Sequence, residues 1–106
     1  MAVHRIRLRA PWKRERENDR DVWRRVFGCP SNLSSREKVR LVLRSESARA
    51  TVLLNGEALG SAPAVFEVTA SLEFRNRLTL TMEGCGEIEG EGREPPFDVS
   101  LEIESD

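Results

Sequence analysis

Apolar and polar residues alternate with a period of two over several short stretches of the chain. At the start, His4, Ile6 and Leu8 alternate with arginines at positions 5, 7 and 9. Such alternation is typical of a half-buried β-strand. The same pattern, or a short run of β-favouring residues, predicts further strands at 39–44, 50–54, 57–60, 65–68, 76–82 and 99–104. Residues 22–27 are apolar at both ends, and their periodicity leaves a strand or a short helix open.

Turn-forming residues separate these stretches. Asn55-Gly56 is a strong hairpin signal, because a type I′ turn needs a positive φ at both central positions. We expect Gly60 to let the chain turn away after the returning strand. Residues 13–21 (KRERENDRD) contain no apolar residue and predict a charged loop or one exposed helical turn. Residues 84–96, rich in Gly, Glu and Pro, predict a long flexible loop.

These elements together predict a single all-β domain over residues 1–106. Seven or eight short strands, no long amphipathic helix and no internal repeat are typical of an antiparallel β-sandwich. A chain of 106 residues is long enough to bury one core without disulfides or metals.

The charge is divided unevenly along the chain. Residues 1–49 carry 14 Lys and Arg against 6 Asp and Glu, and residues 50–106 carry 3 against 12. Such asymmetry can indicate a nucleic-acid surface or an acidic tail. We favour internal neutralisation, in which basic and acidic strands pair within one sheet, because neither half is large enough to fold alone.

An ordered series of short motifs resembles the sugar-binding-like jelly-roll domain at the N-terminus of family 2 glycoside hydrolases, one of the galactose-binding-domain-like sandwiches. The series is Val39-Arg40-Leu41, then VLLNGEALG at 52–60, then Phe66-Glu67-Val68-Thr69 with Leu72, then Asn76-Arg77-Leu78-Thr79-Leu80. Thr69 can cap the turn before Leu72. The resemblance covers about half of the chain, and it implies a jelly-roll sandwich and carbohydrate or partner binding. In those enzymes the catalytic acid and nucleophile lie on a separate barrel, which has no counterpart here, so the resemblance does not imply hydrolysis.

Trp12 and Arg14 are the candidate ligand contacts, with no catalytic residue expected. Aromatic rings are platforms for the apolar faces of sugars, and arginines bond their hydroxyls. Trp12 lies in an expected loop; the alternative, which we prefer, is a hydrophobic plug at the end of the sandwich. Trp23 lies among apolar neighbours and is expected in the core. The absence of tyrosine weakens the glycan interpretation.

Metal, redox and nucleophile motifs are absent from the sequence. His4 is the only histidine and is expected to be a satisfied core or edge residue. Cys29 and Cys85 form no C-x-x-C motif, and we expect two buried thiols; a disulfide between them is the alternative in an exported protein. Glutamates at 83, 87, 89 and 91 offer oxygens for Ca²⁺, but a solvated loop explains them better. We therefore expect no metal and no cofactor.

Partners are expected to be a glycan or a protein. Acidic residues interleave with the N-terminal arginines, and Trp12 is the single aromatic residue among those charges, so we expect no nucleic acid. No stretch is apolar enough for a membrane span or a signal peptide, which predicts a cytoplasmic protein. The sequence thus favours a non-catalytic binding module for carbohydrate; the alternative is a protein-interaction or structural domain with no sugar ligand.

Overall fold

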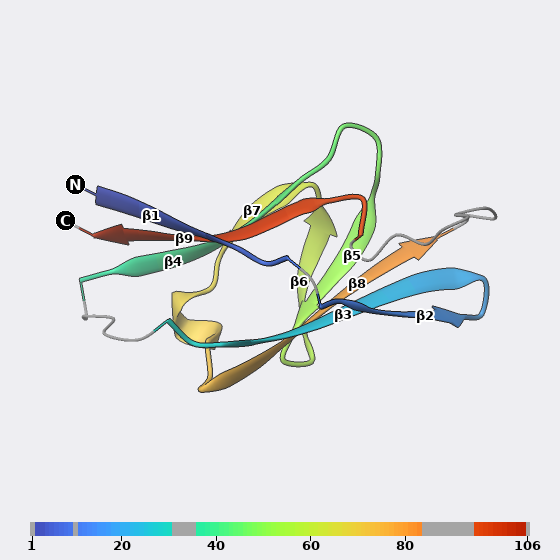
Figure 1. Ribbon diagram of the computed structural model, residues 1–106, viewed down its shortest axis with the longest axis horizontal. Helices are drawn as coiled ribbons and strands as arrows, with labels where there is room; N and C mark the ends of the chain where they lie inside the picture. Colours follow the sequence, from blue (N-terminus) through green and yellow to red (C-terminus); the bar gives the residue numbers. More distant parts are fainter. Residues whose placement is uncertain (1, 10, 31–35, 84–94, 106) are drawn as a thin grey trace.

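The computed structural model describes residues 2–9, 11–30, 36–83 and 95–105. These residues form nine strands and a three-residue 3-10 helix, η1 (Thr69–Ser71). The strands make two antiparallel sheets (Figure 1). The four-stranded sheet has the order β1 (Ala2–Arg7), β9 (Asp98–Ser105), β4 (Lys38–Arg44), β7 (Ala64–Glu67). The five-stranded sheet has the order β2 (Lys13–Glu17), β3 (Arg20–Gly28), β8 (Arg75–Glu83), β5 (Ala50–Leu54), β6 (Glu57–Ala62).

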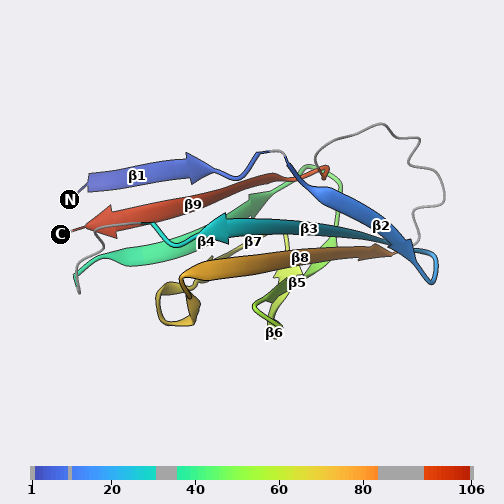
Figure 2. The ribbon, with the colours of Figure 1, turned by 60° about the horizontal axis from the view of Figure 1, so that its bottom comes forward.

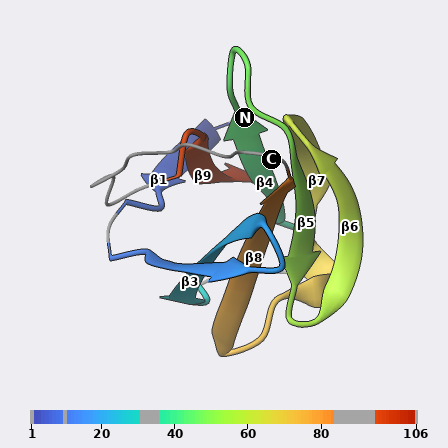
Figure 3. The ribbon, with the colours of Figure 1, turned by 90° about the vertical axis from the view of Figure 1, so that its right-hand side faces the viewer.

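The two sheets face each other as the layers of a β-sandwich with extents of 44 × 25 × 23 Å. Figure 3 looks along the long axis and shows β1, β9 and β4 in one layer and β3, β8 and β5 in the other. In Figure 2 the turn between β2 and β3 lies at one end of the second layer, and η1 lies at the opposite end. The all-β, two-sheet architecture expected from the sequence is confirmed.

Alternate residues of the central strands fill the space between the sheets. Residues 39, 41 and 43 of β4 are buried, as are residues 78, 80 and 82 of β8. Burying one such side chain stabilises the fold by about 1.5–3 kcal/mol relative to leaving it in water. The rest of the buried apolar cluster comes from Leu8, Trp23, Phe27, Ala50, Val52, Leu54, Ala62, Val68, Phe97, Val99, Leu101 and Ile103.

The expectation of a loop at residues 13–21 is wrong. Residues 13–17 form β2, and β3 begins at Arg20, so the described chain has nine strands instead of seven or eight. The turn between them is Asn18-Asp19, with φ of 49° and 64°. Asn and Asp adopt this left-handed conformation more readily than other non-glycine residues, and two positive φ values give the type I′ hairpin turn. Asn18-Asp19 is a pair of turn-forming residues, but the strands beside it lack the apolar alternation by which the other strands were predicted.

An edge strand without apolar residues is stabilised here by cross-strand ion pairs. Arg24 of β3 donates to Glu15 at 2.8 Å and to Glu17 at 3.1 Å, both on β2. Such pairs between neighbouring strands contribute about 0.2–1 kcal/mol each. Charged residues on an edge strand also oppose pairing with another chain.

The other strand predictions hold with shifted boundaries. Residues 22–27, left open between strand and helix, belong to β3, which runs from Arg20 to Gly28. The Asn55-Gly56 turn is confirmed, with φ of 53° and 84°. Most of the segment 84–96, including Cys85 and three of the four candidate calcium glutamates, lies outside the described residues. No helix in the described residues has the length and apolar character that a membrane span requires.

Gly60 does not end its strand, contrary to the sequence interpretation. The strand β6 continues to Ala62, which is buried. The pairing shifts between Val52, opposite Gly60, and Leu53, opposite Ala58, so a β-bulge lies here. Gly60 has a φ of 144°, and a Cβ added to it would lie 3.1 Å from a ring carbon of Phe66. A glycine is therefore required both by the backbone and by the ring that packs against it.

Thr69 also has a role different from the expected turn cap. The residue before η1 makes no side-chain cap. Instead, the Thr69 hydroxyl accepts from the backbone N–H of Val39 at 2.9 Å and lies 3.4 Å from its carbonyl oxygen. The hydroxyl thus continues the pairing between β4 and β7 beyond the end of β7.

Two asparagine side chains join the β5–β6 turn to the start of β8. Asn76 is fully buried; its amide oxygen accepts from Glu73 N–H at 2.8 Å and from Asn55 Nδ2 at 3.0 Å, and its Nδ2 donates to the Glu73 carbonyl at 2.9 Å. Asn55 also donates to the Ser71 carbonyl and accepts from Arg77 N–H at 2.9 Å. These bonds fix the register in which β8 enters the sheet.

We predict that Asn76→Ala lowers the unfolding free energy by about 2–4 kcal/mol, because it leaves several buried polar groups without a partner. Urea denaturation followed by fluorescence measures this change. The exposed Ser61→Ala is the control and should change stability by less than about 0.5 kcal/mol. Equal stability of the two variants would contradict the role given to Asn76.

We also predict that Gly60→Ala destabilises the fold by about 1–3 kcal/mol through backbone strain and contact with the Phe66 ring. Gly28→Ala is the matched control. A Cβ at Gly28 meets only the backbone oxygen of Phe74, at 4.0 Å, so this variant should stay within about 1 kcal/mol of the original. Thermal denaturation compares the two, and a Gly60→Ala protein as stable as Gly28→Ala would refute the bulge argument.

Candidate functional site

Trp12, the first candidate ligand contact, is used by the fold. Its indole Nε1 donates to the carbonyl of Leu8 at 3.0 Å, and its ring is half-buried against the core cluster. The residue lies between β1 of one sheet and β2 of the other. This placement supports the plug at the end of the sandwich over the sugar platform.

Arg14, the second candidate, is occupied by a buried carboxylate. Its guanidinium donates to the two oxygens of Asp21 at 3.1 and 3.2 Å, and Asp21 is only 1% exposed. The same guanidinium lies 5.5 Å from the ring centre of Trp23. A buried acid without this partner would be costly, so Arg14 has a structural role within the β2–β3 hairpin. Trp23 is in the core as expected, and its Nε1 lacks a partner in the described structure.

His4 and the possible metal ligands do not form a centre in the described part of the chain. His4 is exposed on β1, opposite Ile103. Cys29 is half-buried just after β3. No group of three or more His, Cys, Asp or Glu side chains among the described residues is arranged to hold a metal ion.

Ion pairs between neighbouring strands compensate part of the charge on the outer face of the four-stranded sheet. Arg5, Glu102, Arg40 and Glu67 stand opposite one another across four strands. Arg5 contacts Glu102 at 2.9 Å, and Arg40 contacts Glu104 at 3.0 Å. This confirms the expectation that basic and acidic strands pair within one sheet.

The Arg40–Glu104 pair shifts the protonation of both groups. The hydrogen bond from Arg40, and then its positive charge, hold the pKa of Glu104 below its usual value of 4.5. The same bond and the charge of Glu104 raise the pKa of Arg40. Both side chains are partly exposed, so the pair is screened by solvent. Arg7 and Arg44, exposed on the same face, have no ion pair among the described residues.

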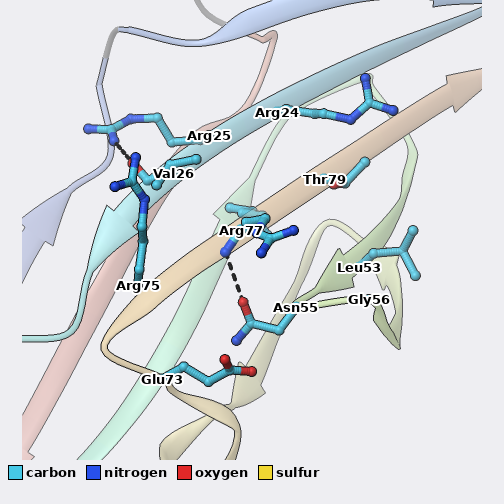
Figure 4. A pocket seen from close by; sticks show the side chains of 11 residues that line it. Arg24, Arg25, Val26, Leu53, Asn55, Gly56, Glu73, Arg75, Arg77 and Thr79 are labelled. Atoms are coloured by element: carbon cyan, nitrogen blue, oxygen red, sulfur yellow. Dashed lines mark hydrogen bonds between the residues drawn. The ribbon is translucent and has the colours of Figure 1, made fainter.

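The outer face of the five-stranded sheet is different, because it holds a hollow of about 480 Å³ rich in arginine. Its residues come from β3, β8, β5, the β5–β6 turn and the segment before β8 (Figure 4). They are Arg24, Arg25, Val26, Leu53, Asn55, Gly56, Glu73, Arg75, Arg77, Leu78 and Thr79. We call this the arginine hollow.

Strand pairing explains why these side chains meet. Arg24, Thr79 and Leu53 stand opposite one another on β3, β8 and β5. Two residues further along β3, Val26 stands opposite Arg77. The backbone N–H of Arg77 donates to Asn55 Oδ1, and its carbonyl accepts from the Asn55 N–H. Because side chains two apart on a strand share a face, Arg75, Arg77 and Thr79 all project to the outside of the sheet while Asn76 and Leu78 anchor its inside.

The arginines of the hollow differ in how their charge is compensated. Arg24 is neutralised by Glu15 and Glu17. Arg25 donates to the carbonyl oxygens of Arg9 and Val26, which carry no formal charge. Among the described residues, Arg75 and Arg77 have no side-chain partner, and Glu73 is the single carboxylate lining the hollow. The hollow is therefore positively charged.

Apolar surface accompanies this charge. Val26 is 40% exposed and Leu53 is half-buried, so the hollow has an apolar floor. Phe74, between the lining residues Glu73 and Arg75, is 93% exposed. Phe74 thus adds an exposed aromatic ring at the border of the hollow.

The sequence contained a signal for this site. The run Phe74-Arg75-Asn76-Arg77 places two arginines on one side of a strand and a buried asparagine on the other. The alternation in this strand was predicted, but residue type alone pointed to Trp12 and Arg14 as ligand contacts. The strand pairing that brings Arg24 and Asn55 to the same face is not visible in the sequence.

Comparisons with known proteins do not assign the chain to a family: no protein-family model matches it, and no curated protein matches it.

The Arg40–Glu104 pair predicts a specific pH dependence. Because the folded state lowers the pKa of Glu104, the pair stabilises the fold above about pH 4.5, and this stabilisation is lost as the pH falls through the lowered folded-state pKa. When the pH is lowered from about 7 to about 3, the Tm of the Glu104→Gln variant should therefore fall less than the Tm of the original protein. Glu46→Gln, in an exposed turn, is the control. If the Tm of Glu104→Gln fell with pH as steeply as that of the original protein, the stabilising role of the Arg40–Glu104 pair would be contradicted.

Proposed function

We propose that the protein is a non-catalytic jelly-roll module that binds carbohydrate in the arginine hollow. The jelly-roll topology is supported by four nested antiparallel pairs: β1 with β9, β3 with β8, β4 with β7, and β5 with β6. A long hairpin wrapped into two sheets produces this nesting, with β2 as an addition at one edge. Without β2 the sheet orders are 1-9-4-7 and 3-8-5-6, two interlocked Greek keys.

A relationship to the galactose-binding-domain-like sandwiches is part of the proposal. The motifs that carry the resemblance lie on consecutive strands of this nested pattern. Asn55-Gly56 forms the β5–β6 turn. The ring of Phe66, in β7, packs on Gly60 of β6, and Asn76 lies at the start of β8. Each motif therefore has a structural role in the chain, independent of any ligand.

Carbohydrate binding is supported chiefly by the composition of the arginine hollow. Sugars present hydroxyl groups around a ring whose faces are partly apolar. The hollow offers donors and acceptors from Asn55, Thr79 and the arginines around a floor of Val26 and Leu53. Small-ligand sites combine an apolar lining with a few fixed polar groups in this way. We place the site in the hollow and not at Trp12 and Arg14, because the Trp12 indole donates to the Leu8 carbonyl and Arg14 pairs with Asp21.

The non-catalytic part of the proposal rests on the carboxylates. Most glycoside hydrolases use a pair of carboxylates at a fixed separation. Among the described residues that line the arginine hollow, Glu73 is the single carboxylate. Binding without bond cleavage is therefore the function that this hollow favours.

The test is a binding screen with a panel of neutral and acidic oligosaccharides, followed by calorimetry. Thr79→Trp fills the hollow, and we expect it to weaken the best ligand by about tenfold or more. Thr51→Trp adds the same ring on the same face of the sheet but outside the hollow, and it should bind like the original protein. Binding that survives Thr79→Trp would place the site elsewhere; a panel with no binder would favour a protein partner and overturn the proposal.

A further inference from the structure

We infer that the saccharide bound in the arginine hollow is acidic, and that Arg75 and Arg77 hold its carboxylate or sulfate group. This inference rests on the proposed function and adds the chemical class of the ligand. It starts from the two guanidinium groups of the hollow that have no partner in the described structure. Arg25 bonds only neutral carbonyl oxygens, so its charge is also uncompensated. One carboxylate, Glu73, cannot neutralise Arg25, Arg75 and Arg77 together, and the hollow keeps a positive charge.

The positions of Arg75 and Arg77 suit one oxyanion or two adjacent ones. They are two residues apart on β8, so their Cα atoms lie about 7 Å apart on the same face. Long arginine side chains at this separation can converge on one group. A guanidinium donates two parallel hydrogen bonds to a carboxylate or sulfate, which is stronger and more directional than a bond to a neutral hydroxyl.

The space beside these arginines is open. Gly28 stands opposite Arg75 in the neighbouring strand and has no side chain. An added Cβ there would meet only a backbone oxygen at 4.0 Å. On the other side of Arg77, a Cβ at Gly56 would meet nothing within 4 Å. Two glycines thus flank the arginine pair and leave room for a ring.

The backbone beneath the pair is rigid. Arg77 N–H donates to Asn55 Oδ1, its carbonyl accepts from Asn55 N–H, and the neighbouring Asn76 is fully buried. Arg77 therefore starts from a fixed Cα, and less conformational entropy is lost when its side chain becomes ordered on a ligand.

A polynucleotide fits the hollow less well than an acidic sugar. Glu15 and Glu17 lie next to Arg24, and Glu73 lines the hollow, so acidic groups border the positive region. No aromatic residue lines the hollow itself, and Phe74 at its border is a single ring, so there is no series of platforms for stacked bases. A compact anion beside an apolar ring face matches both the size and the composition of the hollow.

The experiment compares oligogalacturonic acid with its methyl ester, which keeps the sugar rings and removes the charge. A sulfated oligosaccharide, a neutral galacto-oligosaccharide and a single-stranded oligodeoxynucleotide complete the set. We expect the free acid, the sulfated sugar or both to bind at least about tenfold more tightly than the ester or the neutral sugar. The affinity should fall as salt is raised from about 0.1 M to about 1 M.

The variants identify the residues. Arg75→Gln and Arg77→Gln should each weaken the acidic ligand by about tenfold. Arg44→Gln removes the same charge from the outer face of the other sheet and should leave the affinity unchanged. All three arginines are exposed, so circular dichroism should show folded proteins for all three variants.

Each outcome separates the two claims. Equal binding of acid and ester, or acid binding that is insensitive to Arg75→Gln and Arg77→Gln, overturns the acidic-ligand inference and leaves carbohydrate binding standing. Tighter binding of the oligodeoxynucleotide, lost in the arginine variants, would replace the acidic sugar with a single-stranded nucleic acid as the ligand. If no saccharide binds, the proposed function fails together with the inference.

Discussion

The structure depends on the register of β8, the strand at the centre of the five-stranded sheet. Its inward residues, at positions 76, 78, 80 and 82, anchor the core. Its outward residues Arg75, Arg77 and Thr79 line the arginine hollow. Because side chains alternate with a period of two, a slip of one residue would exchange these two sets. The hydrogen bond from Asn55 Nδ2 to Asn76 Oδ1 opposes that slip. The same constraint therefore positions both the core and the candidate site.

Charge is arranged differently on the two outer faces of the sandwich. On the four-stranded sheet, arginines and glutamates alternate across the central strands and form pairs such as Arg5–Glu102, while Arg7 and Arg44 nearer the strand ends have no ion pair among the described residues. On the five-stranded sheet, Arg24 is paired but Arg75 and Arg77 are not. Unpaired charge next to an exposed apolar floor has no evident role in stability, since like charges close together are unfavourable. The combination of two unpaired arginines with an apolar floor of Val26 and Leu53 is the reason for locating the function in the arginine hollow.

The sequence predicted those elements in which apolar alternation and turn chemistry agree. β5, the Asn55-Gly56 turn and most of β8 follow from the pattern of residues alone. The hairpin of β2 and β3 was missed because its edge strand is stabilised by ion pairs and not by apolar burial. The bulge at Gly60 was missed because it depends on the Phe66 ring from another strand. For the candidate site, residue type pointed to Trp12 and Arg14, whereas the partners that occupy them are visible only in three dimensions.

The most direct test of the account is an NMR titration of the arginine Nε and tryptophan Nε1 signals with an acidic oligosaccharide. The account predicts that the largest changes occur at Arg75 and Arg77, while Arg44 and the Trp12 indole stay unchanged. Changes concentrated at Trp12 and Arg14, with Arg75 and Arg77 unaffected, would contradict it.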